Sequence, residues 1–162
     1  FGAELSFACQ HASTYGREQG ARNAGCRARM QLALAVAAEM ARAMQAGEGA
    51  LPAVRFAQRQ GLSVRLLNDV LDDLQQAGLV AETAGQPGAY VLLHDPSRLT
   101  AATVVRAVLD RGEPPEALGL DHLEPRLRDY SRQAERAWAE ALEQPLTRLL
   151  DTSAGHDGTR AP

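Results

Sequence analysis

Residues 61–93 constrain the fold of this chain more than any other stretch. Ser63 is a favoured N-cap, and Gly78 is typical of the left-handed residue that follows a helix. The apolar residues between them fall on one helical face: Leu67, Val70, Leu71 and Leu74. Two short apolar runs follow, at 79–83 and 89–93, separated by a loop with two glycines and a proline. The stretch therefore predicts a helix followed by a β-hairpin.

Two more helices are expected before this stretch. Residues 28–46 repeat apolar side chains every four positions, at Leu32, Val36, Met40 and Met44. Pro52 suits the first turn of a second, shorter helix that ends near Gly61. Three helices followed by strand, loop and strand is the order of a winged helix. The expected fold class is therefore mainly α with a small β-hairpin: a winged helix-turn-helix plus a C-terminal amphipathic helix.

The C-terminal helix is expected to follow a fourth helix, capped by Thr100, and a linker that contains Pro114 and Pro115. Asp121 is its predicted N-cap. Its apolar residues recur at intervals of four and three, and we call them the seam: Leu123, Leu127, Tyr130, Ala134, Trp138 and Ala141. Such spacing favours packing against another helix. The seam is therefore predicted to contact the first long helix or a second copy of the chain, which makes a homo-oligomer possible.

The chain of 162 residues divides into four parts on this pattern. Residues 1–26 form a membrane-proximal segment and connector, 27–112 the winged-helix domain and 113–150 the C-terminal helix. Residues 151–162 are polar and rich in glycine, which predicts a disordered tail.

The charges of the sequence argue against DNA binding. The formal net charge is −3, and all 17 basic residues are arginines. If the third helix read DNA, the contacts would come from Ser63, Arg65 and Asn68. The same helix carries Asp69, Asp72 and Asp73, and residues 84–88 of the wing contain no cation. Because affinity for DNA depends on neutralising phosphates, DNA is disfavoured as a partner but stays open.

Motifs for catalysis or metal binding are missing from the sequence. The four histidines are widely separated, without HExxH spacing, and neither a P-loop nor GxSxG occurs. Cys9 and Cys26 do not form a CxxC pair. The aspartates at 69, 72 and 73 are better explained as a solvated face than as a metal site. No catalytic residue, cofactor, metal site or small-molecule ligand is therefore expected.

The block from Leu51 to Asp110 resembles the winged helix of Rrf2-type transcription regulators. The resemblance rests on a glycine-rich wing that ends in Tyr90, with Gly88 before it, and then on Pro96 and Thr100. It implies a winged-helix fold and, as an alternative function, DNA-binding regulation of transcription. The cysteines that hold an iron–sulfur cluster in that family would follow Leu109. This chain has no cysteine there, so the resemblance does not extend to a cluster.

The first residues resemble a different family. Gly2, Ala3 and Glu4 are similar to an element that closes the membrane domain of YihY/BrkB proteins, bacterial inner-membrane proteins in which a winged helix follows. The next segment carries Arg17, Arg22, Arg27 and Arg29 against Glu18, and basic residues near a membrane helix favour the cytoplasmic side. A basic surface on a soluble protein is the other explanation.

The leading hypothesis combines these features. The chain is expected to be a non-catalytic, cytoplasmic winged-helix module with a regulatory or assembly role in a YihY/BrkB-like protein. It would lie at the cytoplasmic face of the bacterial inner membrane, joined to a membrane domain upstream of Phe1. The alternative is an Rrf2-like DNA-binding regulator without an iron–sulfur cluster.

Overall fold

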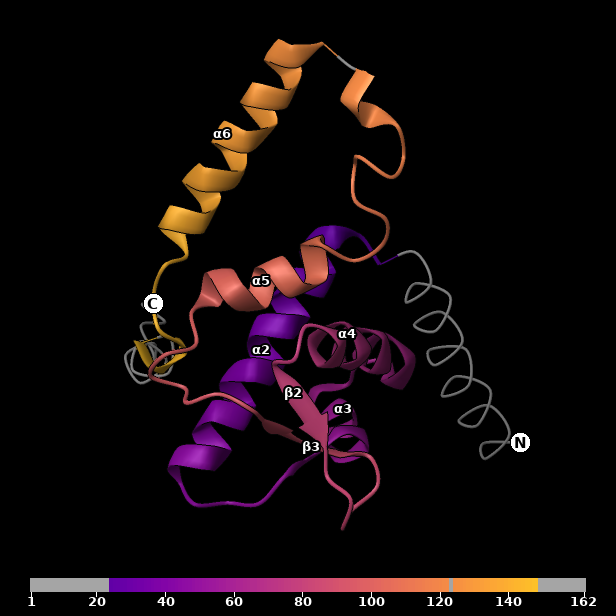
Figure 1. Ribbon diagram of the computed structural model, residues 1–162. Coiled ribbons are helices and arrows are strands. Elements are labelled where there is room, and N and C mark those ends of the chain that lie inside the picture. The colour runs from indigo at the N-terminus through magenta and orange to yellow at the C-terminus, as the bar shows by residue number, and fades with distance from the viewer. Residues whose placement is uncertain (1–23, 123, 149–162) are drawn as a thin grey trace, which may run out of the picture.

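The computed structural model describes residues 24–122 and 124–148 and consists mainly of helices (Figure 1). Its elements, in chain order, are α2 (Cys26–Gln45), β1 (Leu51–Pro52), α3 (Ala53–Gln60), α4 (Val64–Gln76), β2 (Val80–Glu82), β3 (Ala89–Leu92), α5 (Ala101–Leu109), the 3₁₀ turn η1 (Leu120–His122) and α6 (Pro125–Ala141). The predicted fold class, a mainly helical winged helix-turn-helix, is confirmed.

Several predictions concern residues outside the described ranges. They include the Gly-Ala-Glu element at 2–4, the arginines at 17 and 22, Cys9, the first seam residue at 123, and the tail at 151–162. These predictions stay as they were made.

Helices α3 and α4 form the helix-turn-helix. Gly61 follows α3 with a φ of 62°, a left-handed conformation that glycine adopts without strain. Ser63 precedes α4, and its hydroxyl oxygen accepts a hydrogen bond from the backbone N–H of Leu66 at 3.4 Å. This N-cap was predicted and is confirmed. Gly61 and Ser63 together fix the turn that sets α4 against α3.

The wing is a three-stranded antiparallel sheet with the order β1-β3-β2. Val80 pairs with Leu92 in the predicted hairpin, and Leu51 of β1 pairs with Tyr90 on the other edge of β3. Strand β1 was not predicted, because it has only two residues and one of them is Pro52. Proline is compatible with an edge strand, where its missing N–H breaks no ladder.

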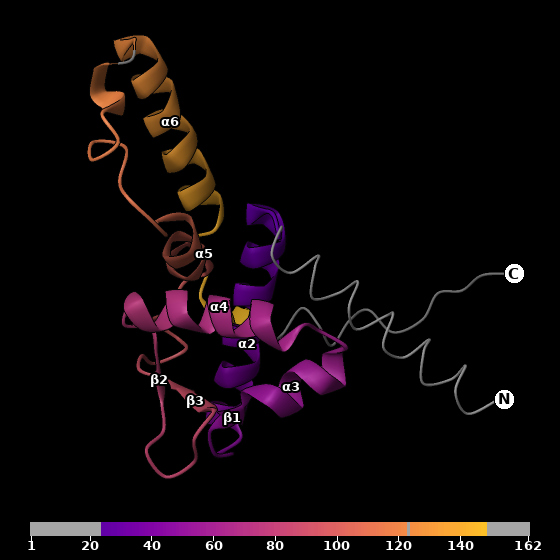
Figure 2. The ribbon, with the colours of Figure 1, turned by 90° about the vertical axis from the view of Figure 1, so that its right-hand side faces the viewer.

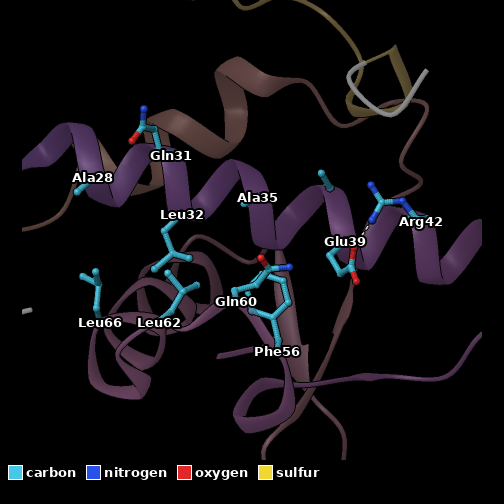
Figure 3. A pocket seen from close by; sticks show the side chains of 11 residues that line it. Ala28, Gln31, Leu32, Ala35, Glu39, Arg42, Phe56, Gln60, Leu62 and Leu66 are labelled. Carbon is cyan, nitrogen blue, oxygen red and sulfur yellow. Dashed lines mark hydrogen bonds and ion pairs between the residues drawn. The ribbon is translucent and has the colours of Figure 1, made fainter. Parts of the chain in front are cut away.

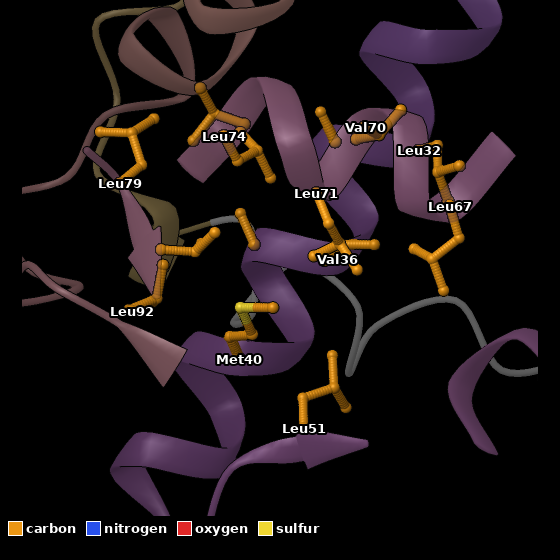
Figure 4. Close-up of a cluster of buried hydrophobic side chains, with 14 of the residues drawn as sticks. Leu32, Val36, Met40, Leu51, Leu67, Val70, Leu71, Leu74, Leu79 and Leu92 are labelled. Carbon is orange, nitrogen blue, oxygen red and sulfur yellow. The ribbon is translucent and has the colours of Figure 1, made fainter. Parts of the chain in front are cut away.

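The core surrounds α2 (Figure 4). Leu32, Val36 and Met40 of α2 are buried, as the four-residue repeat predicted, whereas Met44 is exposed at the end of the helix. The apolar face of α4 packs against α2, and α5 covers a further side of α2. The core therefore fixes the roll of α4 about its own axis, and with it the side chains that α4 presents to solvent.

Beyond α5 the chain leaves this body. Residues 113–141, which we call the arm, run through η1 and α6 and project away from the other helices (Figure 2). Helix α6 begins at Pro125, and Glu124 precedes it, so the prediction that Asp121 caps this helix is wrong. Proline favours the first position of a helix, and here it defines the start, while residues 120–122 form a separate turn.

After the arm the chain returns to the body. The backbone N–H of Ala101 donates to the carbonyl of Gln144 at 3.0 Å, and that of Ala102 donates to the carbonyl of Leu142 at 3.0 Å. Leu146 is fully buried in the core. The arm is therefore attached to the body at both ends, next to the two ends of α5.

None of the seam residues that the structure describes is buried in this single chain. No residue within α6 is buried, and Tyr130 is 75% exposed and Leu127 61%. Ala134 and Ala141 are also exposed, and Trp138 is partly buried. The predicted contact of the seam with a helix or a second copy stays a prediction.

Candidate nucleic-acid interface

The residues predicted for DNA contact lie together at the start of α4. Ser63 caps the helix, and Arg65 and Asn68 are exposed within its first two turns. In a helix-turn-helix the second helix enters the major groove with its N-terminal residues toward the bases. Arg65 and Asn68 occupy that part of α4. Arg65 and Asn68 are three residues apart and share an exposed face of α4, whereas Ser63 is partly buried and its side chain caps the helix.

The acidic residues of α4 are placed differently from the prediction. Asp73 was expected on the exposed face, but it is buried between Arg29 and Arg111. The Nη2 atom of Arg29 lies 2.5 Å from Oδ2 of Asp73, and Nε of Arg111 lies 3.5 Å from Oδ1. Asp69 is partly buried, with Oδ2 at 4.0 Å from Nη1 of Arg29.

The expected cluster of three carboxylates facing a phosphate backbone is thus wrong. Asp73 shares the buried side of α4 with Val70 and Leu74, and arginine neutralises it there. Asp72 alone of the three is exposed. The main electrostatic argument against DNA therefore loses most of its weight, because a paired, buried carboxylate repels phosphate less than an exposed one.

Helix α3 adds two exposed arginines that were counted as charges but not assigned to the site. Arg55 and Arg59 are four residues apart, so they lie on one face of α3. The Nη2 atom of Arg59 lies 3.3 Å from Oε1 of Glu39 on α2. Glu39 also pairs with Arg42. The i, i+4 spacing was the sequence signal for this pair of arginines. Because Arg59 pairs with Glu39, Arg55 is better placed to contact a phosphate.

The loop that joins β2 and β3, at the tip of the wing, holds a small polar cluster. The backbone N–H of Gly88, which has a φ of 75°, donates to Oε1 of Glu82 at 2.5 Å. Thr83 donates through its hydroxyl to the carbonyl of Gln86 at 3.2 Å. Burial raises the pKa of Tyr90, and the charges of Glu82 and Asp72 raise it further. Tyr90 lies on β3, and its hydroxyl is protonated at neutral pH with or without this shift, because the ordinary tyrosine pKa is about 10.

A groove of about 650 Å³ lies between α2 and the helix-turn-helix (Figure 3). Leu32, Phe56, Leu62 and Leu66 form its apolar lining, while Glu39 and Arg42 bond to each other at one end. A small-molecule site requires polar groups that converge on one point, and the polar groups of this groove do not. The groove thus adds no chemistry to the surface of α4.

Metal-binding clusters and membrane-spanning helices are absent from the described part of the chain. Among residues 24–122 and 124–148, no group of three or more His, Cys, Asp or Glu side chains could hold a metal ion. Within the same ranges, no helix is long and apolar enough to cross a membrane.

Comparisons with known proteins agree with the geometry of α3, α4 and the wing. Residues 26–153 match the Rrf2 family model, described as iron-dependent transcriptional regulator. The HTH-type transcriptional regulator CymR of Bacillus subtilis is 32% identical over 112 residues, which are 69% of this chain and 78% of CymR. The HTH-type transcriptional regulator IscR of Serratia proteamaculans is 35% identical over 74 residues, 46% of this chain, and that match spans 45% of the length of IscR.

A solved structure supports the fold. That of IscR from T. potens superposes with a TM-score of 0.60 at 19% identity, covering 82% of this chain and 90% of IscR. At this identity the likeness shows the winged-helix fold alone.

The iron dependence in the family description has no matching donors here. Iron–sulfur clusters are held mainly by cysteine thiolates. The two cysteines of the sequence are Cys9 and Cys26, and the stretch from Asp110 to His122 contains none. The residues that are present do not fit an iron–sulfur cluster.

These findings correct two predictions. The hypothesis of a YihY/BrkB-like membrane-protein module, with the membrane domain of the same polypeptide as its partner, is wrong, because the matched family and the relatives are transcriptional regulators. The judgement that DNA is disfavoured is also wrong, because the matched family and the HTH-type relatives are transcriptional regulators. It rested on an acidic face of α4, and the structure pairs most of that face with Arg29. The chain belongs to the Rrf2 family.

Proposed function

We propose that this protein is a DNA-binding transcriptional regulator that acts without an iron–sulfur cluster, with α4 as its recognition helix. The names of its relatives, HTH-type transcriptional regulators, support this function. The role is binding and not catalysis.

The observation that carries the proposal is the composition of the exposed side of α4. Arg65 and Asn68 are exposed there, while Asp73 is buried and paired. Arginine can make two hydrogen bonds to O6 and N7 of guanine, and asparagine can make two to N6 and N7 of adenine. The two side chains therefore supply one reader for each kind of base pair.

Contacts with the phosphates would come from α3. Arg55 is exposed on the helix that precedes the turn, and in helix-turn-helix proteins this first helix crosses the DNA backbone. Phosphate contacts fix the position of the protein without reading sequence. Arg55 is thus expected to contribute affinity, and Arg65 and Asn68 specificity.

The active form is proposed to be a homodimer joined through α6. Leu127 and Tyr130 of the seam are largely exposed, and Trp138 is partly so. Apolar residues at intervals of four and three suit knobs-into-holes packing with a second helix. A twofold dimer would place two α4 helices on two half-sites of a palindromic operator.

A selection from randomised duplex DNA, followed by equilibrium binding at several salt concentrations, tests the function. We expect a preferred sequence with a half-site repeat. Arg65→Ala should weaken binding to it by ~1–3 kcal/mol and relax the preference at one base pair. The matched control is Arg106→Ala, which removes the same charge from an exposed position on α5 and should bind like wild type.

The proposal fails if wild-type protein enriches no sequence and binds duplex only as weakly as unrelated DNA. It fails equally if Arg65→Ala and Arg106→Ala lose the same affinity, because net charge would then explain the effect.

A further inference from the structure

Asp73 connects three separate parts of the chain. Its side chain is 4% exposed, and each of its two carboxylate oxygens has its own arginine. Arg29 comes from α2, and its guanidinium also reaches the main-chain carbonyl of Asp69 at 3.5 Å. Arg111 lies just after the C-cap of α5. A buried carboxylate needs such partners, because an unpaired buried charge is strongly destabilising.

The position of Arg111 gives this pairing a wider meaning. Arg111 follows Asp110, which caps the C-terminus of α5, and the arm begins two residues later. Both ribbon views place this end of α5 close to α4 (Figures 1 and 2). Arg111 is half-exposed, with 49% of its side chain accessible, whereas Arg29 is largely enclosed at 13%. Arg29 is therefore the fixed partner of Asp73, and Arg111 is the partner that a movement of the arm could withdraw.

Asp73 also lies next to the surface proposed to meet DNA. Its neighbour Asp72 is exposed on α4, and Asn68 stands little more than one turn earlier. Withdrawal of Arg111 would make the electrostatic potential at this part of α4 more negative and would remove one contact that holds the helix. A groove of about 460 Å³ borders this contact, lined by Asp73, Gln76, Thr103, Arg106 and Arg111 among others, so the guanidinium of Arg111 has space to move.

We propose that the Asp73–Arg111 ion pair couples the arm to the recognition helix, so that the state of the arm adjusts DNA affinity. This inference rests on the proposed DNA-binding function. We take the intact ion pair to favour the DNA-binding position of α4; because energetic coupling is reciprocal, DNA bound at α4 then stabilises the start of the arm to the same extent. The reciprocal effect can be measured without knowing what acts on the arm.

The experiment compares amide hydrogen exchange of residues 110–118 with and without a duplex selected by the protein itself. In the wild type, saturating duplex should slow exchange in this stretch. Arg111→Ala should abolish the slowing although α4 still becomes protected, and Arg111→Lys should restore part of it because the charge returns without the planar guanidinium. Arg132→Ala removes the same charge from an exposed position on α6 that does not line this groove; it is the matched control and should behave like wild type.

Affinity provides the second measurement. Arg111→Ala should raise the Kd for the selected duplex by about fivefold or more, a usual size for coupling between sites. Its salt dependence should stay that of wild type, since Arg111 neutralises Asp73 and not a phosphate. Thermal unfolding of each variant without DNA separates this effect from a loss of folded protein.

The outcomes are distinct. If wild type binds a selected duplex and residues 110–118 exchange as before, or if Arg111→Ala retains the slowing, coupling through this ion pair is refuted while the DNA-binding function stands. If wild type selects no duplex, both proposals fall.

Discussion

The backbone N–H of Leu146 donates a hydrogen bond to the carbonyl of Leu99 at 2.9 Å, and the Leu146 side chain is completely buried. Leu99 directly precedes Thr100, the N-cap of α5. The chain therefore leaves the body at the end of α5 and returns at its beginning. The arm is therefore attached to the body at two places, so a displacement of the arm would act on both ends of α5.

Leu146→Ala should lower the free energy of unfolding by about 2–5 kcal/mol, because it leaves a cavity in a fully packed core. Urea unfolding followed by circular dichroism measures the change. The control is Leu118→Ala, at a linker position that is 61% exposed, where an effect within about 0.5 kcal/mol is expected. Equal losses at the two positions would contradict the closure of the arm by Leu146.

Tyr130→Glu should shift the protein from dimer to monomer. Tyr130 is 75% exposed in the single chain, so a carboxylate costs little there, but it would be buried without a partner in a dimer joined by the seam. Sedimentation velocity over a range of concentrations reports the shift. Arg132→Glu, also exposed on α6 but outside the seam, serves as the control. A dimer that survives Tyr130→Glu would place the interface elsewhere.

The fold could be predicted because its signals are local. The caps Ser63 and Thr100 and the four-residue repeat of α2 each depend on residues within a few turns. Strand β1 was not predicted, because two residues carry no periodicity. The pairing of Leu146 with Leu99 is a long-range contact that no local pattern encodes.

The candidate site was predicted in part. Arg65 and Asn68 were named as residues of the exposed face of the predicted third helix, and the structure exposes both. The sequence pattern did not predict the rotation of α4 about its own axis, which decides which of its aspartates are buried. Asp73 follows Val70 by three residues and therefore lies on the buried side of the helix. There it forms an ion pair with Arg29, which is distant in sequence. Counting charges along a helix without their partners produced an acidic face that the folded chain does not have.

Asn68→Ala should reduce discrimination at one base pair and leave the salt dependence of binding unchanged. The amide can pair with two atoms of adenine in the major groove and carries no charge to neutralise a phosphate. The expected loss is about 1–3 kcal/mol on the selected sequence and close to zero on unrelated DNA. Arg55→Ala is the counterpart: it should weaken binding to all sequences and reduce the salt slope by about one. Fluorescence anisotropy with the selected and an unrelated duplex measures both effects. A uniform loss for Asn68→Ala, or a sequence-specific loss for Arg55→Ala, would contradict these assignments.

Asp72→Asn should strengthen DNA binding, most clearly at low salt. Asp72 is the exposed carboxylate of α4, and like charges repel across the short distance to a phosphate backbone. Asparagine has nearly the same shape, so packing is conserved, and a several-fold decrease in Kd is expected that fades as salt screens the charge. Asp129→Asn makes the same change on exposed α6 and should leave Kd unaltered. Weaker binding by Asp72→Asn would mean that this carboxylate accepts a hydrogen bond from a base.

Asp95→Ala should destabilise the protein at neutral pH and progressively less in acid. Oδ1 of Asp95 accepts hydrogen bonds from the Ser97 hydroxyl at 2.7 Å and from its backbone N–H at 2.8 Å. These bonds lower the pKa of Asp95 below its usual value, and Arg98 lowers it further. Because the folded-state pKa lies below the unfolded one, the contribution is complete above the ordinary aspartate pKa of about 4 and disappears as the pH falls through the folded value. Urea unfolding of both proteins at neutral pH and near pH ~3 should show the difference closing. Ser97→Ala, which removes only the hydroxyl donor, should give a smaller difference with the same dependence on pH, and a constant difference across this range would exclude ionised Asp95 as its source.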